Sequence, residues 1–522
     1  MIEKNTFCFL NQCQTVAAPT DWNNEQWEKL WLYNLHYFDD LNAENAALRR
    51  AWHKDLIDRW IDDNPPPSGN GWEPYPLSLR IVNWIKFLLT IEIQHEHENQ
   101  GASHKTAIDK GLYTKWLNSL ALQTRVLSQR LEHHLLGNHL FANAKALAFA
   151  GLFFEGPEAE QWLATGLDIL AREIPEQVLA DGGNFELTPM YHSIMLMDLL
   201  DLINLAKATP HPDITDVFPE WERVAATMVA WLKVMTHPDG EISFFNDAAM
   251  GIALPPQALW SYAEVLGVIK RREEYRPFAK SDTLTLYHLN NSGYLRLENH
   301  QAVAFIDVAK VGPDYIPGHA HADTLSFELS LFGQRVLVNS GISCYGLSAE
   351  RLRQRGTAAH NTVVIDNQDS SEVWSGFRVA RRAYPQEPEL LLGPDSYRIQ
   401  ASHNGYRWLK GKPKHSRAWS LTAHSFAIED TISGLFTKAE ARFHLHPSVR
   451  CEESGDTIVL TMSDGKKAVV SHKGGCRRIE QSLWHPEFGL AVENLCLVFE
   501  IEKHESQKNA SQKSIFELIV NF

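Results

Sequence analysis

The spacing of apolar residues changes once along this chain, near residue 281, and that change limits the folds open to it. Before residue 281, apolar residues recur every three or four positions, as in YHSIMLMDLLDLINLA and WERVAATMVAWLKVM, which is the period of helices with one buried face. After it they alternate, as in AVAFIDV and LSFELSL, which is the period of strands. We therefore predict helices over residues 1–280 and strands over residues 281–522.

The two regions are expected to be separate domains, because a chain of 522 residues is too long for a single core. In the first region, loops such as NPPPSGNGWEP separate the helical stretches, so we expect helical hairpins packed side by side. In the second region, many short strands at near-regular spacing predict an antiparallel sheet or sandwich. The predicted fold class is thus α+β, with a helical domain over 1–280 and a β domain over 281–522.

The net charge of -15 argues against a nucleic acid or an anionic membrane as partner, because both attract basic surfaces. An acidic substrate stays open, since a local cleft can still be basic. Arg378, Arg381 and Arg382 form one basic cluster, which is either such a feature or a solvated loop. The 16 Trp, 14 Tyr and 24 His residues supply flat faces and proton-moving groups, which suit a carbohydrate ligand.

No stretch approaches the roughly 18 apolar residues that a membrane span requires. The first residues lack the pattern of a secretory signal, so we expect a cytoplasmic protein without a membrane span. The six cysteines show no CxxC spacing, which predicts neither a disulfide scaffold nor a cysteine zinc site. We expect them to be reduced or buried.

Two histidines precede a predicted strand in the stretch GHAHADTLSFEL. On an extended backbone His319 and His321 share a face. The alternation after them predicts a strand from about Thr324, with Gly333 and Gln334 turning the chain back into RVLVNSG. The pair could be a general base, two metal ligands or one of each, and the alternative is two surface histidines near a turn.

A helix start is predicted in DGGNFELTPMYHSIMLMDLL, where Thr188 would cap the helix and Pro189 would occupy its first position. Tyr191 and His192 then lie in the first turn. The positive end of the helix dipole would lower the pKa of the tyrosine, which could then move a proton. The alternative is an aromatic side chain packed against a neighbouring helix.

A third polar group lies in EHHLLGNHLFANAKALAF. His134 and Asn138 are four residues apart and share a helical face, provided that Gly137 does not break the helix. Asn138, His139 and Asn143 could form part of a site or cap neighbouring helices. Other polar and aromatic residues without a specific pattern are Trp72, Tyr75, Arg80, Asn83, Asn246, Asp247, His360 and Asn361.

Ordered blocks of the sequence resemble the heparinase II/III-like family of polysaccharide lyases over about residues 30 to 380. The blocks are LWLYNLHYFDDL, WEPYPLSLRIVNWI, GNHLFANAKALAFAGLFF, GGNFELTPMYHSIMLMDLLDL, HPDGEISFFNDAAMGIA, GHAHADTLSFELSLFGQRVLVNSG and RGTAAHNTVVIDNQDSSEVW. The resemblance implies an incomplete (α/α) toroid followed by an antiparallel β-sandwich, with an anionic polysaccharide or oligosaccharide as substrate. It also implies β-elimination at a uronic acid, in which the proton at C5 is removed and the oxygen at C4 leaves.

This chemistry needs a neutral donor for the uronate carboxylate, a base for C5 and an acid for the leaving oxygen. By resemblance, Asn138 is the neutral donor, and His319 and Tyr191 supply the base and the acid, with Tyr191 in both roles for some uronate configurations. The resemblance implies that these residues come from both domains and meet when the domains dock. The residues expected along the substrate are Arg80, Asn83, His139, Glu186, His192 and Asn246.

The resemblance implies no cofactor for the chemistry, but some family members hold a structural zinc ion. His321 and His360 match two of its ligands, while Asn339 in LVNSG stands where many relatives carry Asp. Asn is a poor zinc ligand, and the simple hairpin register places Asn339 opposite Glu328, away from His321. Either a weakened zinc site or none is therefore expected.

Two other functions remain open at this point. A uronyl C5-epimerase would form the same carbanion but return a proton from the opposite face. A non-catalytic glycan-binding or assembly protein for surface polysaccharide would need no base. A cytoplasmic location is awkward for a lyase that degrades external polymer, and family analogy leaves a periplasmic location open as the alternative.

Overall fold

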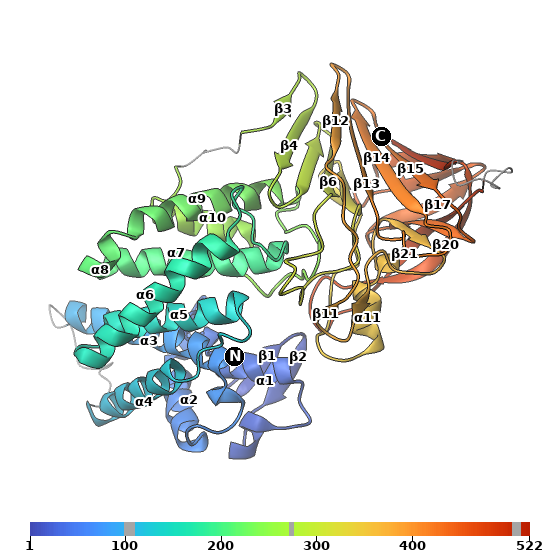
Figure 1. Cartoon of the computed structure of the whole chain (residues 1–522). Helices are drawn as coiled ribbons and strands as arrows, with labels where there is room; N and C mark the ends of the chain where they lie inside the picture. The colour runs from blue at the N-terminus through green and yellow to red at the C-terminus, as the bar shows by residue number, and fades with distance from the viewer. Residues whose placement is uncertain (99–109, 271–275, 504–512) are drawn as a thin grey trace. The chain divides into compact units, whose positions relative to one another are not determined.

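The computed structural model describes residues 1–98, 110–270, 276–503 and 513–522, without the side chains of residues 92–98. Helices occupy the chain up to Val265 and strands prevail from Ala279 onward, as the colour gradient of Figure 1 shows. The change in apolar spacing near residue 281 therefore marks a real change of secondary structure. In the described part of the chain, no helix is both long enough and apolar enough to cross a bilayer.

The helices account for most of the first half of the chain. The α-helices are α1 Lys29–Tyr37, α2 Arg50–Asp63, α3 Pro74–Glu98, α4 Lys110–Ser128, α5 Gly137–Phe153, α6 Pro157–Gln177, α7 Pro189–Ala208, α8 Pro212–Thr215, α9 Phe218–Val234, α10 Pro256–Val265 and α11 Ala349–Arg355. The 3-10 helices are η1 Pro19–Asn23, η2 Asp39–Asn42, η3 Ala46–Arg49, η4 Asn70–Trp72 and η5 Thr357–Ala359.

The chain divides into two compact units, which are described separately. Unit 1 comprises Met1–Gln177 and Asp201–Trp221, and unit 2 comprises Val178–Leu200 and Glu222–Phe522. The boundary between the units thus differs from the change of secondary structure, because α7 and α9 each contribute to both units. In unit 2, Leu187 and Trp231 pack in one apolar cluster with Phe305, which ties these helical segments to the sheet.

Unit 1 has a core rich in tryptophan. Trp22, Trp31, Trp60, Trp84 and Trp116 are all fully buried, and indole rings of this size bury more apolar surface than any other side chain. The rings of Trp60 and Trp84 meet edge to face with centroids 5.7 Å apart. Much of the Trp content that suggested a carbohydrate ligand therefore serves the core.

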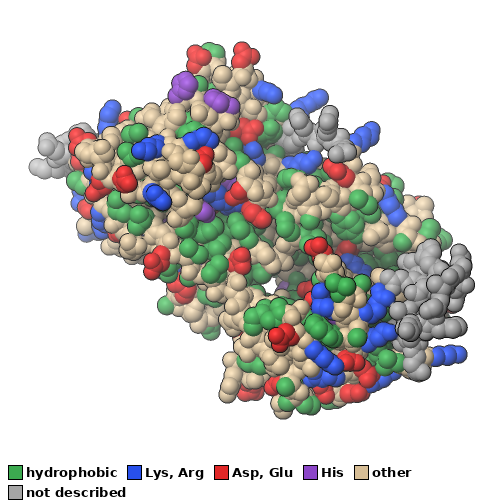
Figure 2. Space-filling view, turned by 180° about the vertical axis from the view of Figure 1, so that it is seen from behind, with side chains coloured by type: hydrophobic (Ala, Val, Ile, Leu, Met, Phe, Trp, Pro, Cys, Tyr) green, Lys and Arg blue, Asp and Glu red, His purple; other side chains and the backbone are tan. Residues whose placement is uncertain are grey.

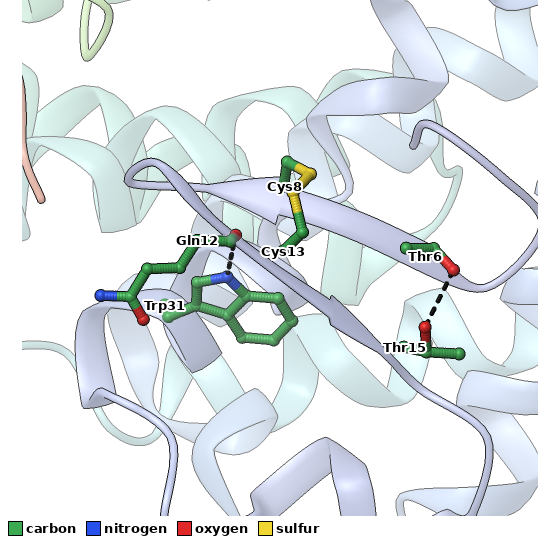
Figure 3. Close-up of a disulfide and its surroundings, with 6 residues drawn as sticks. All are labelled: Thr6, Cys8, Gln12, Cys13, Thr15 and Trp31. Carbon is green, nitrogen blue, oxygen red and sulfur yellow. Dashed lines mark hydrogen bonds between the residues drawn. A yellow bond between two sulfur atoms is a disulfide. The ribbon is translucent and has the colours of Figure 1, made fainter.

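A short hairpin at the amino terminus carries a disulfide between Cys8 and Cys13 (Figure 3). Strands β1 Thr6–Phe9 and β2 Gln12–Thr15 pair with Cys8 directly opposite Cys13, and their Cα atoms are 4.0 Å apart. The expectation that all cysteines are reduced or buried is wrong for this pair, because a two-residue turn brings them together. The free cysteines are Cys344, Cys451, Cys476 and Cys496.

Unit 2 contains antiparallel sheets that share a core. One sheet has the order β3 Ala279–Lys280, β4 Thr285–Leu289, β5 Tyr294–Glu298, β6 Ala302–Asp307, β7 Phe327–Leu331 and β8 Gln334–Leu337. A second has the order β12 Glu389–Leu392, β13 Ser396–His403, β14 Lys414–Thr422, β15 Ser425–Ser433, β22 Lys513–Asn521, β19 Lys467–Lys473, β18 Thr457–Thr461 and β17 Arg450–Ser454. A third has the order β20 Gly475–Trp484, β21 Val492–Ile501, β16 Ala439–His444 and β9 Val363–Ile365, and β10 Val373–Trp374 pairs with β11 Arg378–Val379.

The three larger sheets bury their apolar faces in one cluster, as a β-sandwich does. Phe327 of β7, Phe426 of β15 and Phe443 of β16 bring the three sheets together, with ring centroids 5.6 Å and 6.2 Å from Phe327. The strand-rich half therefore has the packing that its alternating sequence predicts.

The β7–β8 hairpin differs in detail from its prediction. The strand begins at Phe327 rather than near Thr324, and the turn is made by Phe332 and Gly333, both with positive φ. A bulge between Leu329 and Ser330 shifts the register by one residue. The predicted Gly333–Gln334 turn is thus one residue too late along the chain, because alternation alone does not determine which two residues make a turn.

A buried ion pair fixes the loops that precede two of these strands. Arg417 donates through Nε and Nη2 to Asp430, at 2.7 and 2.8 Å. Its Nη1 donates to the carbonyl oxygens of Leu325 and Asn361, at 3.0 and 2.5 Å. The pair thus holds the chain just after His321 and just after His360, which positions both histidine-bearing segments.

We expect Asp430→Ala to destabilise the protein by about 3–5 kcal/mol, because it leaves the fully buried Arg417 charge without its partner. The free energy of unfolding would be measured by urea denaturation. The exposed Asp395→Ala is the matched control and should change it by less than about 0.5 kcal/mol. Equal stability of the two variants would show that Asp430 does not anchor Arg417.

Candidate active site

The centre of the candidate site in unit 2 is the carboxylate of Asp247, which is completely buried. Its Oδ2 accepts hydrogen bonds from His319 Nδ1 at 2.8 Å and from Arg351 Nη2 at 2.7 Å. Its Oδ1 accepts from His321 Nε2 at 2.8 Å and from Arg351 Nη1. Burial opposes the charge, but the Arg351 cation and the hydrogen bonds of both histidines hold the pKa of Asp247 well below its ordinary value.

Asp247 determines which nitrogen of His319 can accept a proton. A carboxylate only accepts hydrogen bonds, so Nδ1 of a neutral His319 carries the hydrogen and Nε2 keeps a free electron pair. The His319 side chain is 14% exposed, while that of Asp247 is fully buried. Nε2 lies 3.8 Å from Glu186 Oε2, beyond hydrogen-bonding distance. The imidazole is therefore oriented from the buried side and has the properties of a general base.

Tyr191 lies against this imidazole. Its ring stacks on His319 with centroids 3.9 Å apart and an interplanar angle of 29°. Its hydroxyl shares a hydrogen bond of 2.8 Å with the hydroxyl of Tyr345. The backbone amide of Tyr191 donates to Thr188 Oγ1 at 2.9 Å, and α7 begins at Pro189, which confirms the predicted helix start.

The predicted effect on the acidity of Tyr191 is wrong. Burial, the neighbouring Tyr345 and the charges of Asp247 and Glu186 together raise the pKa of Tyr191 well above its ordinary value. The phenol therefore stays protonated at neutral pH and can donate a proton. The field of the helix end is outweighed because the ring is buried among other acidic groups.

His321 and His360 form the buried side of the cluster. Because His321 Nε2 donates to Asp247, its Nδ1 accepts a hydrogen bond of 3.1 Å from His360 Nε2. Burial lowers the pKa of His321 to about 4, and burial lowers the pKa of His360 well below its ordinary value. Both rings are thus neutral supports for the Asp247 carboxylate.

Two residues expected along the substrate are structural instead. Arg80 in unit 1 is buried, stacks on Trp60 at 3.8 Å, and uses its donors on Gln123 Oε1, His36 O and Gly71 O. His192 in unit 2 is fully buried and donates from Nε2 to a backbone carbonyl at 3.0 Å. The sequence placed both residues in blocks that resemble the family, but it did not show which way their side chains face.

Asn246 is a buried residue that holds the loop of His321 in place. Its Nδ2 donates to Leu187 O at 2.9 Å and its Oδ1 accepts from the amide of His321 at 3.0 Å. Its own amide donates to Asp323 Oδ2 at 3.1 Å. Since both ends of the carboxamide are engaged, Asn246 positions the histidine loop and does not line the substrate as expected.

The remaining expected residues of unit 1 lie around the start of α5. Gly137 begins this helix, so His134 precedes it and does not share a helical face with Asn138 as predicted. The Asn138 carboxamide is partly exposed and makes no hydrogen bond to any described residue. Its neighbour His139 bonds from Nδ1 to Glu132 Oε1 at 3.0 Å. The role of Asn138 as neutral donor and the contact of His139 with substrate therefore stay predictions.

Asn83 also lies in unit 1 and is half-buried. Its Nδ2 donates to Tyr37 O at 2.9 Å and to Asp39 Oδ1 at 2.7 Å, and its Oδ1 accepts from Asn42 at 3.1 Å. The carboxamide therefore has several protein partners, and a contact with substrate stays a prediction. Glu186, close to His319 in unit 2, likewise stays a prediction.

Comparison with known proteins supports the resemblance over nearly the whole chain. Residues 19–269 match the heparinase II/III N-terminus, and residues 282–513 match the heparinase II/III-like C-terminal region. The chain belongs to the heparinase II/III-like family. Its helical half is therefore the incomplete (α/α) toroid of this family and its strand-rich half the antiparallel β-sandwich, as predicted.

Relatives of known activity align with only part of the chain. A heparin-sulfate lyase of Bacteroides stercoris is 29% identical over 252 residues, which are 46% of this chain and 37% of that protein. A heparin-sulfate lyase of Pedobacter heparinus is 27% identical over 270 residues, which are 49% of this chain and 40% of that protein. The matched stretches thus span less than half the length of these curated relatives.

Solved structures align with a larger share of this chain. A crystal structure of heparinase III has a TM-score of 0.71 at 17% identity and covers 98% of this chain and 79% of its own. A chondroitin AC lyase of Streptomyces coelicolor has a TM-score of 0.51 at 9% identity and covers 94% of this chain and 75% of its own. At these identities the comparisons confirm the fold class.

The zinc site that the heparinase II/III-like resemblance implied has an incomplete set of ligands. His321 Nδ1 and His360 Nε2 face one another, but Asn339 is directed elsewhere, donating to Phe244 O at 2.9 Å and accepting from the amide of Asn361 at 3.1 Å. The described side chains, those of residues 1–91, 110–270, 276–503 and 513–522, include no group of three His, Cys, Asp or Glu suited to a metal ion. A structural zinc ion takes four ligands, so these residues do not fit one.

The residues that sequence reasoning missed are those that support His319. Asp247 was noticed without a role, and Arg351, Tyr345 and Phe377 were not considered. Arg351 lies more than a hundred positions from Asp247, and its segment has no motif that signals a partner. The one available signal was Asp247 itself, the acidic residue in the mostly apolar stretch SFFNDAAMG.

We expect the purified protein to contain much less than one zinc ion per chain, because the described ligands number two rather than three or four. Metal content would be measured by plasma mass spectrometry, and melting temperature with and without EDTA. Stoichiometric zinc together with a lower melting temperature in EDTA would contradict this expectation.

His321→Ala should lower the free energy of unfolding by about 2–4 kcal/mol, because it opens a cavity and removes two buried hydrogen bonds. His319→Ala should lower it by less, about 1–2 kcal/mol, since that side chain is partly exposed and only one hydrogen bond to Asp247 is lost. Thermal and urea unfolding of the two variants would be compared. Equal destabilisation would contradict the division of the pair into a supporting and a reacting histidine.

Proposed function

We propose that this protein is a polysaccharide lyase that cleaves a uronic-acid-containing polysaccharide or oligosaccharide by β-elimination. The observation that carries the proposal is the contact between an oriented imidazole and a protonated phenol. His319 is held through Nδ1 by Asp247, and Tyr191 stacks directly on it. The lyase names of the relatives and family membership over both halves of the chain support the same reaction.

The geometry supports a division of labour in the reaction. Nε2 of His319 takes the proton from C5, and the developing imidazolium is stabilised by the Asp247 carboxylate. The hydroxyl of Tyr191, whose pKa is raised by burial, gives its proton to the oxygen that leaves C4. The Tyr345 hydroxyl, which shares a hydrogen bond with that of Tyr191, keeps the phenol in place.

The carboxylate of the substrate needs a neutral donor, because loss of the C5 proton spreads further negative charge onto it. We propose Asn138 for this role, as family resemblance suggests. Its partly exposed carboxamide has no hydrogen-bond partner among the described residues and is therefore available to a ligand. No step of this scheme uses a metal ion.

The substrate class follows from the relatives. The curated relatives are named heparin-sulfate lyases, and one structural neighbour was solved with chondroitin sulphate. We propose a glycosaminoglycan or another uronate-containing polyanion as substrate, with heparan sulfate as the first candidate to assay. An anionic substrate needs local positive charge on a protein whose net charge is -15.

The proposal is tested by incubating the protein with heparan sulfate, heparin, chondroitin sulfate and alginate and recording ultraviolet absorbance. A lyase creates a double bond between C4 and C5, which absorbs, so absorbance should rise with at least one polymer. His319→Ala and Tyr191→Phe should each reduce the rate by about 10²–10⁴-fold. The control His300→Ala replaces an exposed histidine in the turn before β6 and should leave the rate unchanged.

Two outcomes would contradict the proposal. Exchange of the C5 hydrogen with deuterium from solvent, without new absorbance, would indicate an epimerase. Binding of polymer with neither absorbance nor exchange would indicate a glycan-binding protein.

A further inference from the structure

One segment of unit 2 is rich in basic residues although the whole chain is acidic. The sequence from Val373 to His415 contains eight Lys and Arg residues but three Asp and Glu residues, in a protein of net charge -15. Figure 2 shows one face of the molecule, on which acidic and basic side chains are interspersed. A local excess of positive charge of this kind attracts an anionic partner.

The same segment exposes aromatic rings, which are usually buried. Trp374 is 52% exposed, Trp408 41% and Phe377 40%. Exposed side chains of this size commonly mark a binding surface. We name Trp374, Phe377, Arg378, Arg381, Arg407 and Trp408 the basic–aromatic strip.

The strip is built on two neighbouring segments. Trp374 and Arg378 are opposite one another in the β10–β11 hairpin, and both are exposed. The Arg381 guanidinium lies over the Trp408 ring at 4.0 Å, which joins the end of this hairpin to the β13–β14 loop. The amide of Tyr384 donates to Asn404 Oδ1 at 3.0 Å and holds the two segments together.

The strip is attached to the candidate active site. Arg351, which binds Asp247, also donates from Nε to Gly376 O at 3.0 Å in the hairpin turn. The next residue, Phe377, meets the His319 ring edge to face with centroids 6.0 Å apart. The same arginine therefore fixes both the oriented imidazole and the start of the strip.

Two arginines of the strip have no acidic partner among the described residues. Among the residues that the structure describes, the guanidinium groups of Arg378 and Arg407 form no ion pair, and both are exposed. Arg381 pairs with Glu372 at 3.1 Å, and its plane is held by Trp408. A guanidinium group binds carboxylate or sulfate through two parallel hydrogen bonds, and flat aromatic rings accept the apolar faces of sugar rings.

We propose that the basic–aromatic strip binds an anionic polysaccharide and holds the sugar residues beyond those that meet His319. The inference rests on the proposed function for the identity of its ligand, and on the strip itself for the binding. It assigns Arg378 and Arg407 to carboxylate or sulfate groups and Trp374 and Trp408 to sugar rings. Nucleic acid, which would also contact arginine and aromatic side chains, is the alternative that the test must exclude.

The test measures binding in a His319→Ala background, so that the polymer is not cleaved. The double variant Arg378→Ser with Arg407→Ser should raise the Kd for a heparan sulfate chain of about twenty sugars by about tenfold. The Kd for a tetrasaccharide should rise by less than about twofold, because a short ligand does not extend along the strip. Trp408→Ala should weaken binding of the long chain in the same way.

A matched control removes the same charge elsewhere. Arg276→Ser with Arg450→Ser replaces two other exposed arginines and should leave both Kd values unchanged. If the control weakens long-chain binding as much as the strip variant does, or the strip variant does not weaken it, the proposal is overturned. Equal weakening for single-stranded DNA of the same length would overturn the sugar assignment. Each result is independent of whether the active protein produces a new double bond.

Discussion

The buried Asp247 carboxylate, paired with Arg351, is the interaction on which the candidate site depends. A fully buried carboxylate is costly unless it is paired and fully hydrogen-bonded. Here the arginine supplies the charge, and two histidines supply the remaining donors. Because the carboxylate can only accept, it also selects the tautomer of each imidazole. One buried charge thus determines the state of His319, which reaches the surface, and of His321, which does not.

The same arrangement occurs a second time in unit 2, without access to the surface. His403 bonds to His415 at 3.2 Å, His415 to Asp430 at 2.7 Å, and Arg417 to the same carboxylate. In both clusters a neutral histidine pair ends on a carboxylate that an arginine neutralises. Only the cluster around Asp247 adds a further, partly exposed histidine. Exposure of one ring, rather than the network itself, separates a candidate site from a structural core.

Asn339 helps to connect the segments that carry the two buried histidines of the site. Asn339 holds backbone atoms of Phe244 and Asn361 together. The amide of Asn339 donates in turn to the buried carboxylate of Glu328 at 2.8 Å. The loops that carry His321 and His360 are thus joined by these hydrogen bonds and by those that Arg417 donates to Leu325 O and Asn361 O. Arg351 extends the same network to the hairpin turn at Gly376, so the site and the basic–aromatic strip share one rigid support.

The sequence by itself determined the order of secondary structure, the family, the cap at Thr188, and the places of Tyr191 in the first turn of a helix and of His319 just before a strand. These features follow from local patterns, since apolar period, capping residues and ordered motifs are properties of short segments. Only the tertiary structure decided which polar residues face the site. Arg80 and His192 are buried, and a bulge shifts the register of the β7–β8 hairpin. Asp247 pairs with Arg351, which lies more than a hundred residues away in the sequence. Such pairs depend on long-range packing and on the need to neutralise buried charge. A local sequence pattern contains no information about either.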